Sequence, residues 1–423
     1  MDGSAKPGGR DPTTKTPGEG SAPVRREFLV FGRPFVAEEE IREVVDTLRS
    51  GWIGFGPKTL RFEADFASYV HASHAVAVNS CTAALHLALL AAGVGPGDEV
   101  ITTPLTFAAT ANVITHAGAR PVFVDVDRAT QNLRPDLVEA ALTPRTKAIL
   151  PVHMAGWPCD LESISRIAER NGIPVIEDAA HAIEAWYKGR KVGAISAMTA
   201  FSFYATKSLT TAEGGMLTTE DGALANRIRT LRLHGLDRDA WKRYSQGGFL
   251  PYETVEPGYK YNMTDVQASM GIHQLARIEN SLTKRERLWC LLDQGLRDLE
   301  ELRIPAFPQE AGSRHARHLY TIHLELERLE IDRDEFIRAL AAENIGAGVH
   351  FIPIHLHAYY RDAYGYRRGD YPCAEWIGDR TVSLPLSAGM SEEDVADVVA
   401  AVHKVAVRHR RKPVFQAAGE AAI

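Results

Sequence analysis

Three segments of the chain combine residue types that could bind and activate a small molecule. NSCTAAL follows an apolar run and opens a helix, so the backbone N–H groups of Cys81 and Thr82, with the Thr82 hydroxyl, could bind a phosphate at a helix N-terminus. VIEDAAH is an apolar strand ending in Asp178, and a carboxylate in a dry site pairs strongly with a protonated ring nitrogen. FSFYATKSLT supplies Ser202 and Lys207 just before a GG turn.

Each segment taken alone also has an ordinary structural explanation. Ser80 or Thr82 could simply be the N-cap of the helix, and Asp178 could cap the helix that follows its strand. Lys207 could be a solvated surface lysine. A lysine in a core segment, however, is costly unless it is paired, lowered in pKa or covalently modified, and a Schiff base both removes that cost and activates the amine.

The three segments together are more specific than any one of them. A phosphate cradle, a strand-end acid, a serine and a lysine are the parts that hold pyridoxal phosphate, whose ring nitrogen must stay protonated for the ring to act as an electron sink. The chain has no GxGxxG, since GWIGFG has its glycines in another order, and no GxxxxGK[ST]. A nucleotide-hydrolase function is therefore disfavoured.

The composition limits the class of protein. The 423 residues are 45% hydrophobic and 24% charged, with a net charge of −6, which are values for a globular chain of two or three domains without nucleic acid or an anionic membrane as main partner. No stretch approaches the roughly 20 apolar residues of a membrane span. The four cysteines form no CxxC pair, which favours reduced thiols in a cytoplasm over disulfides or zinc: Cys81, Cys159, Cys290 and Cys373.

Periodicity predicts the organisation of the chain. Residues 1–24 lack an apolar core and indicate a disordered tail, not a signal peptide, and 411–423 a second flexible tail. FVAEEEIREVVDTLRSG predicts an amphipathic helix, and strands then alternate with helices, which favours a mostly parallel sheet covered on both faces. Around Gln274 the pattern changes to long charged helices, including QLARIENSLTKRERLWCLLDQGLRDL, and we expect an α/β domain over 25–280 and a smaller α+β domain over 281–410.

With these segments in view, the chain resembles the pyridoxal-phosphate sugar aminotransferases of the DegT/DnrJ/EryC1/StrS family. Ordered matching blocks run from about Phe28 to Val405: SGWIGFGP, NSCTAALHLAL, TPLTFAATAN, VHMAGWPCDL, IEDAAHA, FSFYATKSLTTAEGG, LRLHGL, GYKYNMTDVQA, QLARIE, HFIPIH and SLPLS. HGLDRDAW and GYKYNMTD are most similar to the branch that aminates UDP-4-ketopentoses. The resemblance implies the type I aminotransferase fold and a homodimer with active sites at the subunit interface.

Carried onto matching positions, the resemblance implies a role for each site residue. Lys207 would form the internal aldimine, Asp178 would pair with the pyridine nitrogen, and Phe107 would stack on the ring. His181 would lie near the ring hydroxyl, and Ser202 would bind the phosphate with Cys81 and Thr82. Relatives that dehydrate sugars carry histidine in place of this lysine, so Lys207 favours transamination.

Three positions depart from the family pattern. The phosphate loop reads SCT where SGT is usual, but a backbone donor survives that change. The stacking position carries Phe107, whereas relatives have tyrosine or tryptophan, and each presents a π face. KYNM replaces the common NYRM, so the expectation that Asn262 reaches the phosphate from the other subunit rests on the UDP-4-ketopentose branch alone.

The resemblance predicts that glutamate is the amino donor and a nucleotide-linked 4-ketosugar the acceptor. Such an acceptor has no α-carboxylate, so cationic or backbone donors must bind its diphosphate. Lys260, Arg238 and Arg317 are candidates, although each could equally be a solvated charge. His350 and His355 could line the sugar pocket. His355 and His357 form an HxH pair with no third ligand in sight, so no metal is expected.

The sequence leaves competing functions open. The rival acceptor is a dTDP-4-keto-6-deoxyhexose, which differs by one exocyclic carbon. A pyridoxal-phosphate-binding regulatory protein without turnover is the alternative from another class, and a plain α/β scaffold without cofactor is a third.

Overall fold

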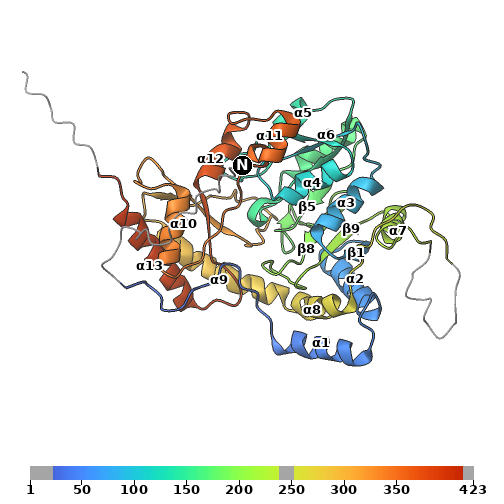
Figure 1. Ribbon diagram of the computed structural model, residues 1–423, viewed down its shortest axis with the longest axis horizontal. Coiled ribbons are helices and arrows are strands. Elements are labelled where there is room, and N and C mark those ends of the chain that lie inside the picture. Colours follow the sequence, from blue (N-terminus) through green and yellow to red (C-terminus); the bar gives the residue numbers. More distant parts are fainter. Residues whose placement is uncertain (1–21, 238–251, 413–423) are drawn as a thin grey trace, which may run out of the picture.

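The computed structural model describes residues 22–237 and 252–412. Arg238 and most of the predicted N-terminal and C-terminal tails lie outside the described residues. The largest feature of the described part is a mixed sheet with helices on both faces (Figure 1). Its strands, in spatial order, are β1 (His74–Val78), β9 (Gly215–Thr219), β8 (Met198–Ser202), β5 (Ile176–Asp178), β4 (Thr146–Leu150), β2 (Glu99–Thr102) and β3 (Arg120–Phe123).

The sheet is parallel except at one strand. β5 pairs with β8, and β2 pairs with both β3 and β4, in parallel register. Bridges from Ile149 to Val175 and from Val152 to Asp178 join β4 to β5, so the two halves continue into one sheet. β9 alone runs antiparallel to its neighbours β1 and β8. The predicted mostly parallel sheet is therefore present, and the carboxyl ends of six strands meet at one edge.

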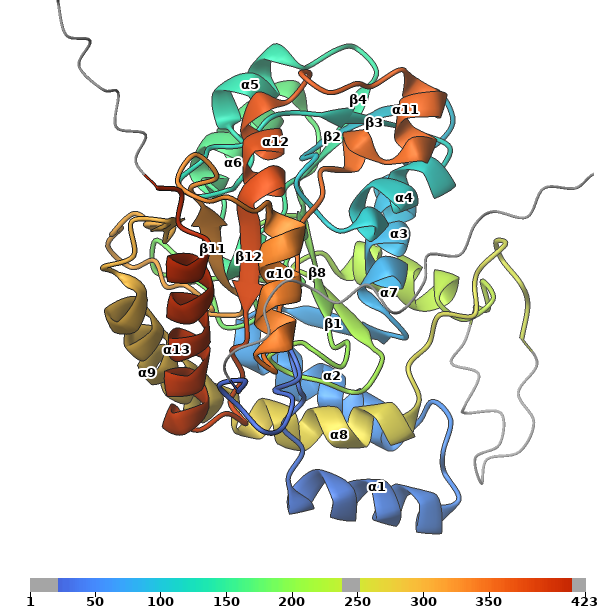
Figure 2. The same ribbon diagram turned by 60° about the vertical axis from the view of Figure 1, so that its left-hand side comes forward.

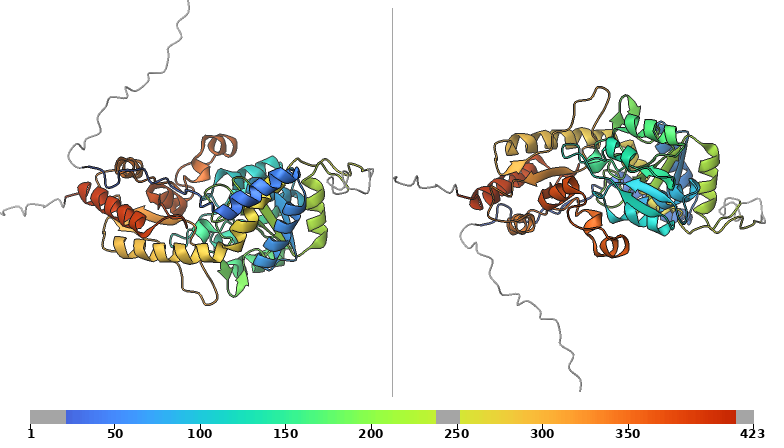
Figure 3. Two further views of the ribbon diagram at one scale, coloured as in Figure 1. Left: turned by 90° about the horizontal axis from the view of Figure 1, so that it is seen from below. Right: turned by 90° about the horizontal axis from the view of Figure 1, so that it is seen from above.

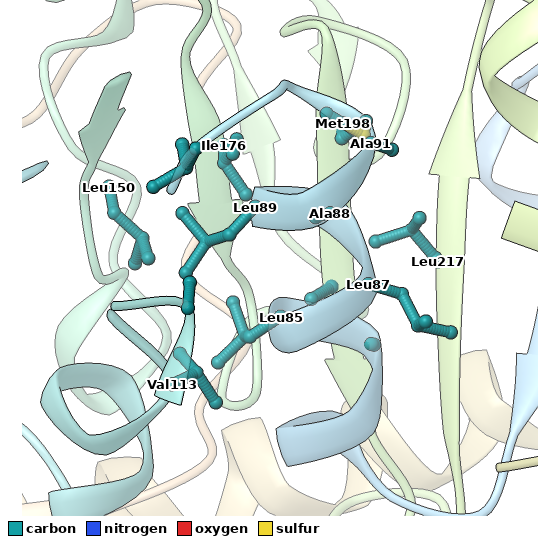
Figure 4. Close-up of a cluster of buried hydrophobic side chains, with 14 of the residues drawn as sticks. Leu85, Leu87, Ala88, Leu89, Ala91, Val113, Leu150, Ile176, Met198 and Leu217 are labelled. Carbon is teal, nitrogen blue, oxygen red and sulfur yellow. The ribbon is translucent and has the colours of Figure 1, made fainter. Parts of the chain in front are cut away.

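Helices cover this sheet because their apolar faces have no other place to be buried. The helix after β1 is α3 (Cys81–Ala91), which is apolar almost all round and is buried between sheet and neighbouring helices. Figure 4 shows Leu85, Leu87 and Leu89 of α3 among side chains of the sheet and of α4. The other helices around the sheet are α2 (Pro57–Val70), α4 (Ala108–His116), α5 (Pro135–Ala140), α6 (Leu161–Asn171), α7 (Gly222–Leu231) and α8 (Asp265–Ala276).

A small antiparallel sheet lies in the C-terminal part (Figure 2). A second hydrophobic cluster forms around it. Val24 and Leu29, from the start of the described chain, pack against this cluster as well. The domain boundary expected near residue 280 stays a prediction. The elements of this part are α9 (Ile278–Leu296), β10 (Leu302–Arg303), β11 (Tyr320–Leu324), α10 (Arg333–Ala342), α11 (Ala358–Tyr364), α12 (Pro372–Arg380), β12 (Thr381–Leu384) and α13 (Glu392–Arg408); a hairpin, β6 (Trp186–Tyr187) and β7 (Arg190–Lys191), lies apart.

The charged segment beginning at Gln274 is not one continuous helix. α8 ends at Ala276 and α9 begins at Ile278, because Arg277 between them leaves helical geometry with φ −111° and ψ 10°. The Arg277 guanidinium forms an ion pair with Glu40 and lies 5.1 Å from the ring centroid of Phe35. The break thus coincides with the contact that fixes the N-terminal segment onto α8.

The predicted N-terminal helix is α1 (Glu38–Ser50), which lies along α8 (Figures 1 and 3). Acidic residues occupy its first turn and Gly51, with φ +74°, ends it, as the sequence indicates. Its orientation is unusual, because polar Glu40 and Thr47 are buried while the apolar stripe faces outward. Ile41, Val45 and Leu48 are 48%, 37% and 56% exposed.

Candidate active site

A cavity of about 560 Å³ opens at the edge of the sheet where the parallel strands end. The ends of β5 and β8 and the segments that follow β1, β2, β4, β5 and β8 contribute to it, and so do Glu213 and Gly214, which lead into the antiparallel strand β9. The lining side chains come from Ser80, Cys81, Thr82, Leu85, Thr106, Phe107, Ala109, Thr110, Val152, Asp178, Ala180, His181, Ser202, Tyr204, Thr206, Lys207, Glu213, Gly214, Val349, His350 and Phe351. The fold therefore brings eight of the predicted site residues to one cavity: Cys81, Thr82, Phe107, Asp178, His181, Ser202, Lys207 and His350.

Asp178 is the last residue of β5 and is 5% exposed. Its backbone is fixed from three sides, by N–H donation to Pro151 and by carbonyl acceptance from His153, while Ala179 donates to Ala200 of β8. One carboxylate oxygen accepts from the Thr110 hydroxyl at 2.8 Å and the other from the Ala180 N–H at 3.1 Å. Burial raises the pKa of Asp178, and these hydrogen bonds and the nearby Lys207 oppose that rise.

Lys207 lies in the connection from β8 to β9, residues 203–214, which folds back on itself. Phe203 donates to Gly214 and accepts from Thr211, and the Lys207 N–H donates to Tyr204. Burial of the amine lowers the pKa of Lys207 to about 8, while Cys81 and Asp178 act in the opposite direction. A lysine with that pKa is partly neutral near pH 8 and can act as a nucleophile or carry a proton.

The N-terminus of α3 forms the predicted phosphate cradle. Ser80 is the N-cap, since its hydroxyl accepts from the Ala83 N–H at 3.1 Å, so the capping explanation is correct for Ser80. The first N–H groups of a helix have no acceptor within it, which leaves Cys81 and Thr82 available to an anion. Burial raises the pKa of Cys81 well above its ordinary value, so this thiol stays protonated beside the cradle.

The GG turn noted in the sequence explains how β9 approaches the cradle. Gly215 pairs with Val78 of β1 on one side and Ser202 of β8 on the other. A Cβ at this position would lie 2.5 Å from the Ser80 carbonyl carbon and 2.6 Å from the Cys81 nitrogen. Only a glycine allows this approach, and so Gly215 sets the distance between Ser202 and the N-terminus of α3.

Aromatic rings line the outer part of the cavity. Phe107 is 64% exposed, an unusual state for a phenylalanine, and its ring centroid lies 6.2 Å from that of Phe351. The His181 ring stacks on Phe351 at 6.0 Å, and its Nδ1 is buried without a hydrogen-bond partner among the described residues. An exposed apolar ring and an unpaired ring nitrogen in one cavity both suit a flat, polar, aromatic ligand.

Several histidines lie near the Lys207 amine, and no sequence pattern predicts one of them as a site residue. His318 is missing from the sequence-based candidates, yet its ring lies 4.7 Å from that of His181. The Nδ1 atom of His350 forms a hydrogen bond of 2.8 Å with the Ser383 hydroxyl. Burial first, and the charge of Lys207 second, lower the pKa of His318 and bring that of His350 to about 3. These rings are therefore neutral at physiological pH. A histidine inside a strand-like run, as His318 is, gives no periodic signal.

The remaining sequence candidates lie elsewhere in the described chain. Asn262 forms a bridge with Val78 of its own chain, and its Oδ1 is buried without a partner among the described residues. His355 is buried against Glu375 at 2.9 Å, and exposed Lys260 has a backbone bridge to Leu233. Arg317 lies over Trp289 at 4.5 Å in a separate hollow. None of these four lines the cavity.

The described residues also contain no group of three or more His, Cys, Asp or Glu side chains placed to hold a metal ion. Likewise, no helix within 22–237 or 252–412 is both long and apolar enough to cross a membrane.

Comparison with known proteins identifies the family. The sequence model of the DegT/DnrJ/EryC1/StrS aminotransferase family matches residues 34–403. The chain belongs to this family. The spore coat polysaccharide biosynthesis protein SpsC of Bacillus subtilis is 51% identical over 382 residues, 90% of this chain and 98% of SpsC.

Solved structures of the family agree. Spr1654 of Streptococcus pneumoniae, in its PMP form, superposes with a TM-score of 0.84 and 36% identity over 90% of this chain and 99% of its own. It was also solved in a PLP form. DesI, solved in the presence of its TDP-sugar product, superposes with a TM-score of 0.81 and 30% identity over 91% of this chain and 95% of its own.

Membership confirms three of the sequence predictions. The fold is the type I aminotransferase fold, the enzyme class is that of the pyridoxal-phosphate-dependent sugar aminotransferases, and pyridoxal phosphate is the cofactor. The cavity contains the chemistry that this cofactor requires: an amine at Lys207, a buried carboxylate at Asp178, N–H and hydroxyl donors at the α3 cradle, and an unpaired nitrogen on His181. The residues present therefore fit the group that the family uses.

Proposed function

We propose that this enzyme moves the amino group of L-glutamate to C4 of a nucleotide-linked 4-ketosugar of the UDP-4-ketopentose type. The observation that carries the proposal is the shared cavity of Lys207 and Asp178, an amine with lowered pKa and a buried carboxylate. That pair is what the family chemistry needs. His350 and Phe351 also line the cavity, and we propose that the sugar binds against them.

The residues divide the work as follows. Bound pyridoxal phosphate supplies an electron sink that weakens the Cα–H bond of the donor amino acid. Asp178 keeps the pyridine nitrogen protonated, and the α3 cradle with Ser202 holds the phosphate. Lys207 would hold the cofactor between reactions, and its free Nζ would accept the proton from the donor Cα and deliver a proton to sugar C4. The face from which it delivers that proton sets the configuration of the new amine.

The sugar class is supported by relatives, whereas the individual sugar is not. SpsC belongs by its name to polysaccharide biosynthesis, and the DesI structure was solved with a TDP-sugar product. The alternative acceptor, a dTDP-4-keto-6-deoxyhexose, adds one exocyclic carbon, an apolar difference of about 1–3 kcal/mol in discrimination. An assay of both ketosugars with glutamate, with each product identified by its mass, distinguishes the two acceptors. Amination of the deoxyhexose alone would replace the pentose in this proposal.

We further propose that the active enzyme is a homodimer whose subunits share each active site. No arginine lines the cavity among the described residues, although both substrates are anionic, so their cations must come from outside this set. The outward apolar stripe of α1 offers a surface for a second copy. Four free cysteines are consistent with the cytoplasmic location that we also propose.

The test removes the amine. Lys207→Ala should lose the visible absorbance of lysine-bound cofactor and aminate neither ketosugar, while Lys147→Ala, at an exposed position on β4, should match wild type. Normal turnover by Lys207→Ala would refute the assignment. A single half-reaction with glutamate separates the enzyme from a non-catalytic cofactor-binding protein. Release of 2-oxoglutarate supports the enzyme, and failure to release it would support the regulatory alternative.

A further inference from the structure

Thr106 and Thr110, which are not among the sequence-based candidates, form a hydrogen-bonded chain that ends at Asp178. The Thr110 hydroxyl lies 2.8 Å from one carboxylate oxygen of Asp178, and the Thr106 hydroxyl lies 2.8 Å from that of Thr110. Both side chains are buried, with 2% of Thr106 and none of Thr110 exposed, and both line the cavity. The three groups form an uninterrupted chain from the start of α4 to the end of β5.

The direction of donation along this chain follows from simple counting. An ionised carboxylate can only accept, so the Thr110 hydroxyl must give its single hydrogen to Asp178. The Thr110 oxygen can then only accept from Thr106, which becomes the first donor of the chain. With Asp178 protonated, the second donation would lose this fixed direction. The chain is therefore fully ordered only when Asp178 carries its charge.

The hydrogen bonds to Asp178 oppose the effect of burial, which is the largest influence on the pKa of its carboxyl group. Burial disfavours the ionised carboxyl, and the charged or titratable groups that act on it are Lys207, Cys81 and His153. Two of the hydrogen bonds to Asp178 favour its ionised form, one from the Ala180 backbone and one from Thr110. The backbone donor is available whatever the sequence, whereas the Thr110 donor depends on a side chain.

We propose that Thr106 and Thr110 act as a hydroxyl relay that holds Asp178 ionised and aimed at the ring nitrogen of the cofactor. Both are positioning residues, and their role rests on the proposed function. A purely structural role, in which each hydroxyl only satisfies a buried neighbour, would lower stability on removal without changing the protonation of Asp178. A relay predicts that Thr106 acts only through Thr110.

The experiment measures cofactor binding and the carboxyl itself, not turnover. Thr110→Val should raise the dissociation constant of pyridoxal phosphate about tenfold, as expected for loss of a hydrogen bond to a charged group, whereas Thr110→Ser should stay within about twofold of wild type. Thr106→Val should raise it about threefold in the wild type and not at all in the Thr110→Val background. Thr115→Val, on the same helix but outside the cavity, is the matched control, and thermal unfolding checks that each variant is folded.

Infrared spectra of the apoprotein supply an independent readout. Asp178→Asn identifies the carboxyl band, and the relay predicts that Thr110→Val shifts protonation of that band to higher pH while Thr110→Ser does not. Equal effects of Thr106→Val in both backgrounds, or an unshifted band in Thr110→Val, would overturn the relay. Since the spectra need no cofactor, they test the relay even where wild type fails to bind pyridoxal phosphate, which is the result that would instead reject the proposed function.

Discussion

The end of β5 and the outer face of α1 treat polar and apolar groups in opposite ways. At Asp178 a charge is buried, and it meets two hydrogen-bond donors and lies near Lys207 and His153. On α1 one charge is buried, that of Glu40 paired to Arg277, while Ile41 and Leu48 are exposed to water. In the first region, hydrogen bonds stabilise a buried charge. In the second, apolar side chains are exposed to water, which does not stabilise a monomer.

The difference indicates what each region lacks in a single chain. The surroundings of Asp178 are complete apart from a small positively charged ring, and the surroundings of α1 are complete apart from an apolar protein surface. One site is finished by a cofactor and the other, in our proposal, by a second copy. Four changes test this comparison, in order of expected effect.

The largest effect is expected inside the cavity. Asp178→Asn keeps the shape and the neighbours but removes the negative charge, so turnover should fall by about 10³-fold while cofactor still binds. Turnover with glutamate and a ketosugar is the measurement. Asp160→Asn, at the N-cap of α6 and outside the cavity, is the control that should stay near wild type. A wild-type rate in Asp178→Asn would remove the electrostatic role of this carboxylate.

The second-largest effect is expected on the exposed apolar face of α1. The double variant Ile41→Glu, Leu48→Glu places two like charges on the apolar stripe, so the dimer should dissociate, as measured by light scattering with size-exclusion chromatography. Activity should fall by about 10²-fold with it, because the cations supplied by the partner are lost. Arg166→Glu, exposed on α6, changes charge elsewhere and should remain dimeric. A monomeric, fully active wild type would contradict the comparison.

A third change tests the approach of β9 to the cradle. Gly215→Ala places a methyl group against the backbone of Ser80 and Cys81, which cannot move without displacing α3. The dissociation constant of pyridoxal phosphate, followed by fluorescence titration, should rise by about 30-fold. Gly95→Ala is the matched control, since nothing lies within 4 Å of a Cβ built there. Unchanged binding in Gly215→Ala would show that the cradle tolerates a wider spacing.

The smallest effect concerns pH. Because burial lowers the pKa of Lys207 to about 8, the amine is an ammonium below that pH and neutral above it. Only the neutral amine attacks the cofactor aldehyde, so the rate of cofactor capture by apoprotein should be about tenfold higher at pH 9 than at pH 7 and level off beyond. Stopped-flow absorbance measures it. A rate that keeps rising up to pH 10.5 would indicate an ordinary, solvated lysine.

Local patterns predicted much of this molecule. Capping and periodicity located α1 and α3, and strand-end chemistry pointed to Asp178 and Lys207, because each of these signals lies within a short stretch of sequence. The break at Arg277 gave no such signal, since neither glycine nor proline marks it. It coincides with an ion pair to Glu40, more than two hundred residues away.

Other features depend on which surfaces meet. The period of α1 shows that it has an apolar face but cannot show whether that face meets the core or solvent. The antiparallel insertion of β9 between β1 and β8 is set by pairing across distant segments, which no window of the sequence contains. Thr106 and Thr110 were missed for a similar reason. Hydroxyl side chains at or just before the first turn of a helix are common, and only the neighbouring β5 gives these two a role.

The place of β9 also has a consequence for biosynthesis. Strand β1 leaves the ribosome early, but its partner in the sheet is synthesised only after β2, β3, β4, β5 and β8. The closure of so long a loop is slow, and until it occurs the glycine that seats against Ser80 is missing from the nascent sheet. Binding of pyridoxal phosphate should therefore follow the insertion of β9 between β1 and β8 in each new chain.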